Sequence, residues 1–247
     1  ITSIAMFYDL EDPSKFVSDI AKVLDLDGIW VLELSYLPLM LSQNAFDTIV
    51  HEHLEYYHLE VLEFLFSKFG LKVVDVKLND INGGSFRIFV QHTNKNIDDD
   101  SQKRIIELRK KEKELQLKTN IQFDSFIERI NNEKNHLVSF LKNELSLGKT
   151  IHCYGASTKG NTLLQFYNLD NKFIKYIADR NPDKWGRKTI GTDIPIISEK
   201  ESHSLNPDYF LILPWHFIEE FKEREQEFLN RGGKLIVPLP KFQIIEK

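Results

Sequence analysis

Apolar and polar positions alternate along the first third of the chain in a way that predicts strands and helices in turn. Residues 1–6 form a short apolar run that indicates a strand already in progress, so we expect a fold whose beginning lies outside this sequence. Pro13 suits the first turn of a helix, and Asp12 can accept hydrogen bonds from the free N–H groups of that turn. Residues 29–34 are almost continuously apolar, as is typical of a strand buried on both faces of a parallel sheet.

The same alternation ends in a predicted antiparallel pair. A helix is expected over residues 59–68, and Gly70 stops it. Residues 71–76 predict a strand, a turn follows at 79–84, and residues 85–92 alternate as the partner strand. This order of elements is that of the second half of a doubly wound α/β domain.

The middle of the chain has a different pattern. Residues 95–147 contain neither glycine nor proline, and their apolar positions recur at helical spacing, which predicts two helices at about 100–117 and 121–146. Most of their charges are expected to face solvent. From residue 149 a second alternation predicts a Rossmann-like unit, with strands at 150–154, 173–178, 193–197, 209–213 and 234–237 and helices at 162–167 and 217–229. The predicted organisation is α/β throughout: a first domain over 1–94, a helical connector over 95–148 and a Rossmann-like domain over 149–247.

Composition narrows the class of partner. With 32 basic and 37 acidic residues the net charge is −5, which argues against nucleic acid or an anionic membrane surface as a partner. No apolar run approaches the roughly 20 residues of a membrane span. Cys153 is the sole cysteine and lies in an apolar string, so we expect a buried thiol and a reducing, cytoplasmic setting.

Titratable residues are concentrated in the stretch from His51 to Tyr57. Two imidazoles and two carboxylates flanked by apolar residues are typical of acid–base sites, so His53 is a candidate base with Glu52 beside it. On a helix, the spacing of His51 and His53 would turn the two rings about 200° apart, so no metal site is expected. The stretch also suits the polar start of a core-facing helix, and both interpretations stay open at this point.

Further candidates lie at predicted strand ends and turns. The turn from Gly155 to Asn161 follows a strand and opens a helix, where backbone N–H groups can bind an anion, although a simple tight turn would look the same. Arg180 follows the next strand and would suit a bidentate phosphate contact. The candidate substrate-binding side chains are Tyr56, Asn82, Ser85, Ser157, Thr158, Lys159, Asn161, Arg180, Trp215 and His216.

Several motifs together resemble the nucleotide-sugar C-methyltransferases, a family that includes the S-adenosylmethionine-dependent C-3 methyltransferases of deoxysugar biosynthesis. The resemblance spans nearly the whole chain. It rests on these segments in order: Phe46-Asp47-Thr48-Ile49-Val50-His51-Glu52-His53-Leu54-Glu55-Tyr56, Asn82-Gly83-Gly84-Ser85-Phe86-Arg87, Tyr154-Gly155-Ala156-Ser157-Thr158-Lys159-Gly160-Asn161-Thr162, Ala178-Asp179-Arg180-Asn181-Pro182, Pro214-Trp215-His216 and Gly232-Gly233-Lys234-Leu235-Ile236-Val237-Pro238-Leu239-Pro240.

The resemblance implies three parts: an N-terminal zinc module, a class I methyltransferase domain and a C-terminal Rossmann-like domain. This chain would carry the later half of the second part and all of the third. The zinc cysteines and the glycine-rich loop that holds S-adenosylmethionine do not occur in it. Only one wall of the cofactor site is then expected here, at Ala5, Met6 and Phe7, with the rest supplied by a missing N-terminal half or a partner chain.

The family's chemistry, carried over, makes His53 the base that removes the proton beside the keto group of a nucleotide-linked sugar, with Glu52 as its partner. The diphosphate would bind between the domains, at the Gly155–Asn161 turn and Arg180. The family often has tyrosine where Val50 stands and histidine where Asp9 stands. Two alternatives therefore stay open: O- or N-methylation of another sugar or capsule precursor, and a non-catalytic nucleotide-sugar-binding module.

Overall fold

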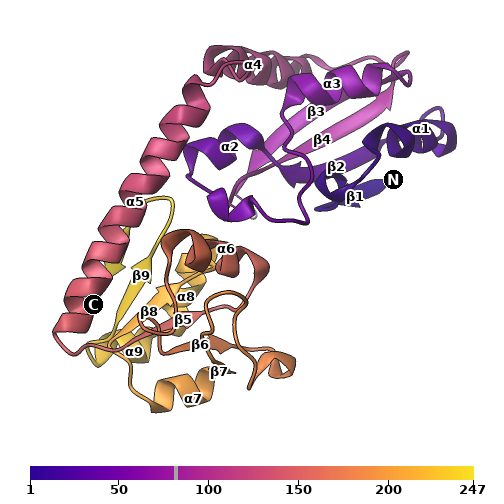
Figure 1. The fold of residues 1–247 in the computed structure, drawn as a ribbon. Helices are drawn as coiled ribbons and strands as arrows, with labels where there is room; N and C mark the ends of the chain where they lie inside the picture. Colours follow the sequence, from indigo (N-terminus) through magenta and orange to yellow (C-terminus); the bar gives the residue numbers. More distant parts are fainter. Residues whose placement is uncertain (81–82) are drawn as a thin grey trace. The chain divides into compact units, whose positions relative to one another are not determined.

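The protein, seen in a computed structural model that describes residues 1–80 and 83–247, is an α/β fold with two mixed sheets, of which the second is mostly parallel. Its internal contacts divide the chain into two compact units. The first holds Ile1–Gln43 and His51–Phe126, and the second holds Asn44–Val50 and Ile127–Lys247. The chain therefore passes between the units three times, on either side of Asn44–Val50 and within the long helix α5 (Ile121–Ser146) (Figure 1).

A four-stranded sheet in the order β1-β2-β4-β3 forms the base of the first unit. β1 (Thr2–Ile4) runs parallel to β2 (Trp30–Ser35). β4 (Ser85–His92) is antiparallel to β2 on one side and to β3 (Leu71–Asn79) on the other. The predicted antiparallel pair is thus confirmed.

Among the described residues, four α-helices lie wholly within the first unit. α1 (Pro13–Val23) begins as predicted, because the Asp12 carboxylate accepts a hydrogen bond from the Lys15 N–H at 2.9 Å. α3 (Leu59–Ser67) and α4 (Asp99–Leu115) pack on β3, while α2 (Leu37–Ser42) was not predicted. Rings and aliphatic side chains fill the core between sheet and helices, among them Phe7, Trp30, Tyr57, Leu62, Phe66 and Ile88.

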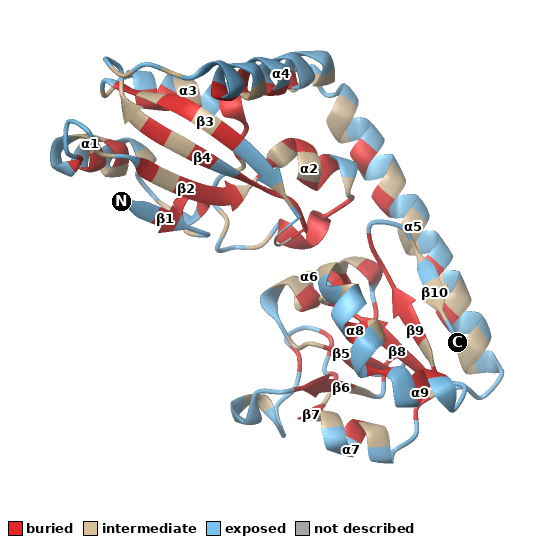
Figure 2. Cartoon of the chain, turned by 180° about the vertical axis from the view of Figure 1, so that it is seen from behind, coloured by how far each residue is buried: buried red, intermediate tan, exposed pale blue. Residues whose placement is uncertain are grey.

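The two predicted connector helices are confirmed as α4 and α5. α4 begins after Asp98, whose side chain accepts from the N–H groups of Asp100 and Ser101. Ile105 and Leu108 on α4 are buried in the core of the first unit. The remaining face of α4 is largely exposed (Figure 2), as its many charges lead one to expect.

A six-stranded sheet in the order β10-β9-β8-β5-β6-β7 forms the second unit. All of its pairs are parallel except that of β9 with β10. The order reverses between β5 and β8, and ligands of doubly wound sheets bind beyond the carboxyl ends of the strands at such a point. The strands are β5 (Ile151–Tyr154), β6 (Tyr176–Asp179), β7 (Ile196–Ser198), β8 (Tyr209–Ile212), β9 (Lys234–Val237) and β10 (Gln243–Ile245).

The strands of the second sheet are apolar in sequence because they are buried. β5 and β8 are buried along their whole length (Figure 2), with Cys153 fully buried as expected. The helices between the strands are α6 (Thr158–Tyr167), α7 (Glu199–Ser204), α8 (Ile218–Arg224) and α9 (Gln226–Asn230). The single helix predicted over 217–229 is therefore two, and the predicted strands at 173–178 and 193–197 begin later, at Tyr176 and Ile196.

Candidate functional site

In the first unit, the candidate residues gather where β1 and β2 end. Ala5 directly follows β1 and continues the pairing, since its N–H donates to the Glu33 carbonyl at 2.8 Å. Its φ of 53° is in the left-handed region, which a residue with a Cβ rarely adopts. Strained backbone of this kind is common at ligand sites, and here it turns the chain at the carboxyl edge of a parallel pair.

The stretch from His51 to Tyr57 is a turn followed by an extended loop, so it is not the start of a helix. Two N–H groups, of Leu54 and Glu55, donate to the Tyr8 carbonyl at 2.9 and 3.2 Å. The Tyr57 carbonyl accepts from the Leu37 N–H at 2.9 Å. The loop is thereby tied to the segments that follow both β1 and β2.

His53 is half-buried in this loop and is surrounded by polar groups. Its ring lies over that of Tyr8, with 4.3 Å between the centroids. The charges of His53 and Glu52 both act on Asp9, whose pKa is raised by partial burial, lowered by the imidazole and raised by Glu52. An imidazole whose charge is coupled to a carboxylate can take up a proton and hold the resulting charge.

A buried network, which the sequence analysis missed, fixes the end of this loop. Glu112 on α4 is 6% exposed and accepts four hydrogen bonds. The donors are the Tyr36 hydroxyl at 2.8 Å, the His58 imidazole at 3.0 Å and the N–H groups of Leu59 and Glu60 at 2.6 and 3.1 Å. Leu59 and Glu60 are the first residues of α3, so the Glu112 carboxylate caps this helix. It also holds His58, the residue that follows Tyr57.

The other candidates of the first unit occupy different surroundings. Phe7 is fully buried among aromatic rings, and Met6 is half-buried against the same core. Tyr56 is half-buried, which raises the pKa of its hydroxyl. Ser85 is buried at the start of β4, opposite Ser35. Asn82 lies outside the described residues.

In the second unit, a tight turn joins β5 to α6. Gly155 has a φ of +85°, and a Cβ there would lie 2.9 Å from the Pro214 ring, so only glycine fits. Ser157 caps α6 by accepting from the Gly160 N–H at 3.0 Å. The side chains of Ser157 and Thr158 are exposed at the helix N-terminus, where an anion is favoured.

The loop after β6 supports this turn. Asp179, at the end of β6, accepts from the Ala156 N–H and the Asn181 N–H, both at 2.8 Å. Lys184 donates to the Ala156 carbonyl at 2.8 Å and to Asp179 at 3.2 Å. Asp179 therefore stabilises the conformation of the loops that follow β5 and β6. The sequence analysis did not select it as a candidate.

Three of the predicted residues, Lys159, Trp215 and His216, meet around a fourth that was not predicted. Asp47 is 1% exposed, and its Oδ2 accepts from the Trp215 indole N–H at 3.0 Å. Its charge acts on that of Lys159, and Lys159 acts in turn on His216. Asp47 thus lies at the centre of a buried polar cluster within the second unit.

Burial shifts the titration of this cluster. Desolvation raises the pKa of Asp47 and lowers that of Lys159, and each charge partly offsets the shift of the other. Burial, with the nearby lysine, lowers the pKa of His216 to about 4, so its imidazole is neutral at pH 7. Four buried polar atoms of this unit have no hydrogen-bond partner among the residues that the structure describes: Asp47 Oδ1, Asn161 Oδ1, Tyr167 Oη and His216 Nδ1.

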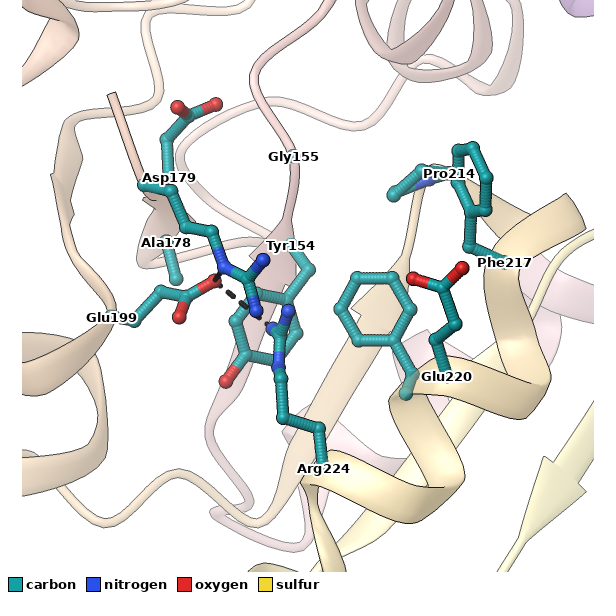
Figure 3. Close-up of a pocket in the computed structure, with 11 residues that line it drawn as sticks. Tyr154, Gly155, Ala178, Asp179, Glu199, Pro214, Phe217, Glu220 and Arg224 are labelled. Carbon is teal, nitrogen blue, oxygen red and sulfur yellow. Dashed lines mark hydrogen bonds and ion pairs between the residues drawn. The ribbon is translucent and has the colours of Figure 1, made fainter.

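Arg180 lies in a separate cavity of about 320 Å³ beyond β5 and β6. Its guanidinium is mostly exposed and approaches the Glu199 carboxylate at 3.3 Å. Arg224 of α8 donates to the same oxygen of Glu199 at 3.0 Å and lies over the Tyr154 ring at 5.1 Å (Figure 3). Arg180 is therefore not part of the Asp47 cluster, and its charge is already shared with a carboxylate.

Comparison with known proteins shows what the chain is similar to. The model of the C-methyltransferase C-terminal domain matches residues 80–240. The C-methyltransferase NovU of Streptomyces niveus is 32% identical over 239 residues, which cover 97% of this chain and 56% of that protein. The chain thus spans little more than half the length of this relative. Within the described residues, no helix has the length and apolar character needed to cross a bilayer.

Proposed function

The chain belongs to the family of C-methyltransferase C-terminal domains, and on this premise we propose that it is part of an S-adenosylmethionine-dependent enzyme that methylates a carbon of a nucleotide-activated keto deoxysugar. The proposal reaches beyond the family because it names the substrate and the methyl donor. It rests on the His53 loop in the first unit and on the polar cluster and α6 turn in the second.

The first sheet supports the view that residues 1–94 are the later half of a class I methyltransferase domain. Its order β1-β2-β4-β3 combines one parallel pair with a terminal antiparallel hairpin. Among the described residues β1 has a strand neighbour on one side only, so its other edge can take a further parallel strand. We propose that the missing half adds there, with the connector at 95–148 and the Rossmann-like domain at 149–247 following.

His53 is the proposed base. It removes the proton from the carbon next to the keto group, and the electron pair of that C–H bond becomes the enolate that attacks the methyl group. S-adenosylmethionine, when bound, supplies that electrophilic methyl group. Asp9, whose charge is coupled to that of His53, stabilises the imidazolium that forms there, and Glu52, next to His53 in the chain, is the proposed second carboxylate. The strained Ala5, with Met6 and the backbone of Phe7, forms one wall of the cofactor site at the end of β1.

The second unit is the proposed nucleotide site. The exposed Ser157 and Thr158 at the start of α6 suit the diphosphate, and Lys159 adds a cation at the same turn. Trp215 and His216 lie close to Lys159 through Asp47. Arg180, Asn161, Tyr56, Asn82 and Ser85 remain proposed contacts to the nucleotide or the sugar.

One observation carries the proposal: His53 lies at the carboxyl edge of β1 and β2 with its charge coupled to Asp9. In the complete enzyme, we expect His53→Ala to lower turnover by about 10²- to 10⁴-fold. His51→Ala, at an exposed neighbour, is the matched control and should retain activity.

Deuterium exchange then isolates the proton step. In D₂O without methyl donor, the wild type and His51→Ala should exchange the proton beside the keto group, and His53→Ala should not. Undiminished exchange in His53→Ala would remove His53 as the base. Carbon NMR of the product separates C-methylation from O- or N-methylation.

A further inference from the structure

Glu112 is a buried carboxylate on α4, outside the loop that carries the proposed base. Each of its two oxygens accepts two hydrogen bonds. Oε1 accepts from the Tyr36 hydroxyl and the Leu59 N–H. Oε2 accepts from the His58 imidazole and the Glu60 N–H. Because the Glu112 side chain is only 5% exposed, water takes little part in these contacts, and the carboxylate fixes its four donors relative to one another.

The four donors come from two segments that meet at the carboxyl edge of the first sheet. Tyr36 directly follows β2, whereas the other three donors directly follow the loop at 51–57. The backbone joins the same two segments, since Tyr36 forms a parallel bridge with Tyr57 and the Leu37 N–H donates to the Tyr57 carbonyl at 2.9 Å. Glu112 therefore clamps the end of the loop to the segment that follows β2.

The middle of the loop is anchored on Tyr8. The N–H groups of residues 54 and 55 donate to the Tyr8 carbonyl, and the His53 ring lies over the Tyr8 ring. Only residues 56 and 57 separate these contacts from the residues that Glu112 holds. Because so short a connection has little slack, a movement at the Glu112 end is transmitted to the contacts between His53 and Tyr8.

We propose that Glu112 is a positioning residue for His53: by holding the end of the loop at 51–57, it keeps the imidazole over the Tyr8 ring. This role rests on the proposed function, in which His53 is the base. The hydrogen bonds of Glu112 go to the two segments described above, so it acts on His53 through the loop and not by contact. Misplacing a reacting group by about 1 Å can cost about 10²-fold in rate, so such a clamp bears directly on turnover.

Glu112→Gln loosens the clamp at nearly constant size. The glutamine amide keeps one oxygen and replaces the other by NH₂, which cannot accept a hydrogen bond from an N–H group. The two backbone donors, those of Leu59 and Glu60, bind different oxygens, so one of them loses its acceptor whichever way the amide is turned. Glu107→Gln removes the same charge from an exposed position of the same helix and is the matched control.

The first test needs no ligand and measures nuclear Overhauser effects by NMR in the 247-residue chain. In the wild type, ring protons of His53 and Tyr8 should give a cross-peak, and those of Phe7 and Trp30, whose centroids are 5.9 Å apart in the same core, give a reference. In Glu112→Gln the His53–Tyr8 cross-peak should lose intensity relative to the reference. An unchanged ratio would overturn the proposal, and so would an equal loss of both cross-peaks.

Two further variants separate positioning from stability. Ile88→Val destabilises the same core without touching the clamp, so it should keep the His53–Tyr8 cross-peak of the wild type. Loss of the cross-peak in Ile88→Val would overturn the proposal, because general loosening would then explain the effect. Tyr36→Phe removes one of the four donors but keeps the ring on Phe86, and it replaces Glu112→Gln in the test if that variant does not fold. Its cross-peak should weaken in the same direction, and an unchanged one would then contradict the clamp.

The second test measures turnover in the complete enzyme. Glu112→Gln should lower kcat by at least about tenfold and leave the KM for the keto sugar near that of the wild type, while Glu107→Gln should change neither. Combined with His53→Ala, Glu112→Gln should cause no further loss, because it acts through a base that is already absent. Losses that multiply in the double variant would overturn the proposal.

The two tests also separate this proposal from the proposed function. Undiminished turnover in His53→Ala would remove the base from the proposed function. The cross-peak between His53 and Tyr8 still decides, by itself, whether Glu112 holds His53 in place.

Discussion

The two units use the same pair of chemical groups, a carboxylate and a base, in opposite surroundings. In the first, His53 is half-buried in a loop, and its charge acts on the exposed Asp9. In the second, Asp47 is 1% exposed, and its charge acts on the half-buried Lys159. The first arrangement leaves the base accessible to a substrate, and the second keeps the carboxylate away from it.

This difference assigns different roles to similar residues. Exposed charges are screened by water, so replacing them alters chemistry more than stability. Buried charges depend on one another, so replacing one alters folding as well as binding. The contrast can be tested by three substitutions, which we order by expected effect.

The largest effect is expected from Trp215→Phe in the second unit. The variant removes the indole donor, so Asp47 Oδ2 joins Oδ1 without a hydrogen-bond partner. We expect a loss of about 1–3 kcal/mol in the free energy of unfolding, measured by urea denaturation. Trp185→Phe is the control, because that indole also donates a hydrogen bond, to the Asp179 carbonyl, but is 43% exposed. Equal losses in the two variants would contradict the contrast between buried and exposed groups.

An intermediate effect on stability is expected when the pH is lowered. The pKa of His216 is lowered to about 4 in the folded chain, against about 6.5 for an unperturbed histidine. Between these values the unfolded chain binds a proton that the folded chain does not, so stability falls as the pH falls from 6.5 to 4. His216→Gln should reduce this slope by up to about 1.4 kcal/mol per pH unit, measured as urea midpoints across that range.

His136→Gln on α5 is the matched control for the acid titration, because His136 is exposed. It should retain the slope of the wild type. An unchanged slope in His216→Gln would mean that His216 takes up its proton as readily in the folded chain as in the unfolded one.

The smallest effect on stability is expected from Glu52→Gln in the first unit. Glu52 is exposed, and exposed substitutions usually change the free energy of unfolding by no more than about 0.5 kcal/mol. Turnover of the complete enzyme should nevertheless fall, since Glu52 is the proposed second carboxylate beside the His53 base. A large loss of stability would show that this loop is held by its charges, contrary to the contrast drawn above.

Much of the fold could be predicted from residues that act locally. The Asp12 cap, the helices over Asp99–Leu115 and Ile121–Ser146, and the antiparallel pair of β3 and β4 follow from caps, periodicity and alternation. α2 could not be predicted, because a short apolar run with Pro38 near its start has no helical period of its own. The break between α8 and α9 depends on Glu225, which is buried and accepts from the Tyr154 hydroxyl at 2.7 Å.

The candidate sites were predictable to the extent that their residues form motifs. Lys159, Trp215 and His216 were selected from local sequence, and the structure brings them together. Asp47 and Glu112 were not selected, because each is an ordinary acid in sequence and gains its role only from partners far along the chain. The sole signal was the apolar neighbourhood of Asp47, between Phe46 and Ile49, which is unusual for a solvated carboxylate.

The segment Asn44–Val50 has a consequence for the order in which the protein is made. It belongs to the second unit, and the Asn44 amide meets the Pro240 carbonyl 196 residues later. At about 5–20 residues per second, a ribosome needs about 10–40 seconds to synthesise that interval. The first unit ends at Phe126, whereas the rings that pack on Phe46, those of Phe166 and Tyr167, are synthesised after it. In a nascent chain, Phe46 and Asp47 therefore stay exposed until residues of the second unit have been synthesised, although the residues on either side of this segment belong to the first unit.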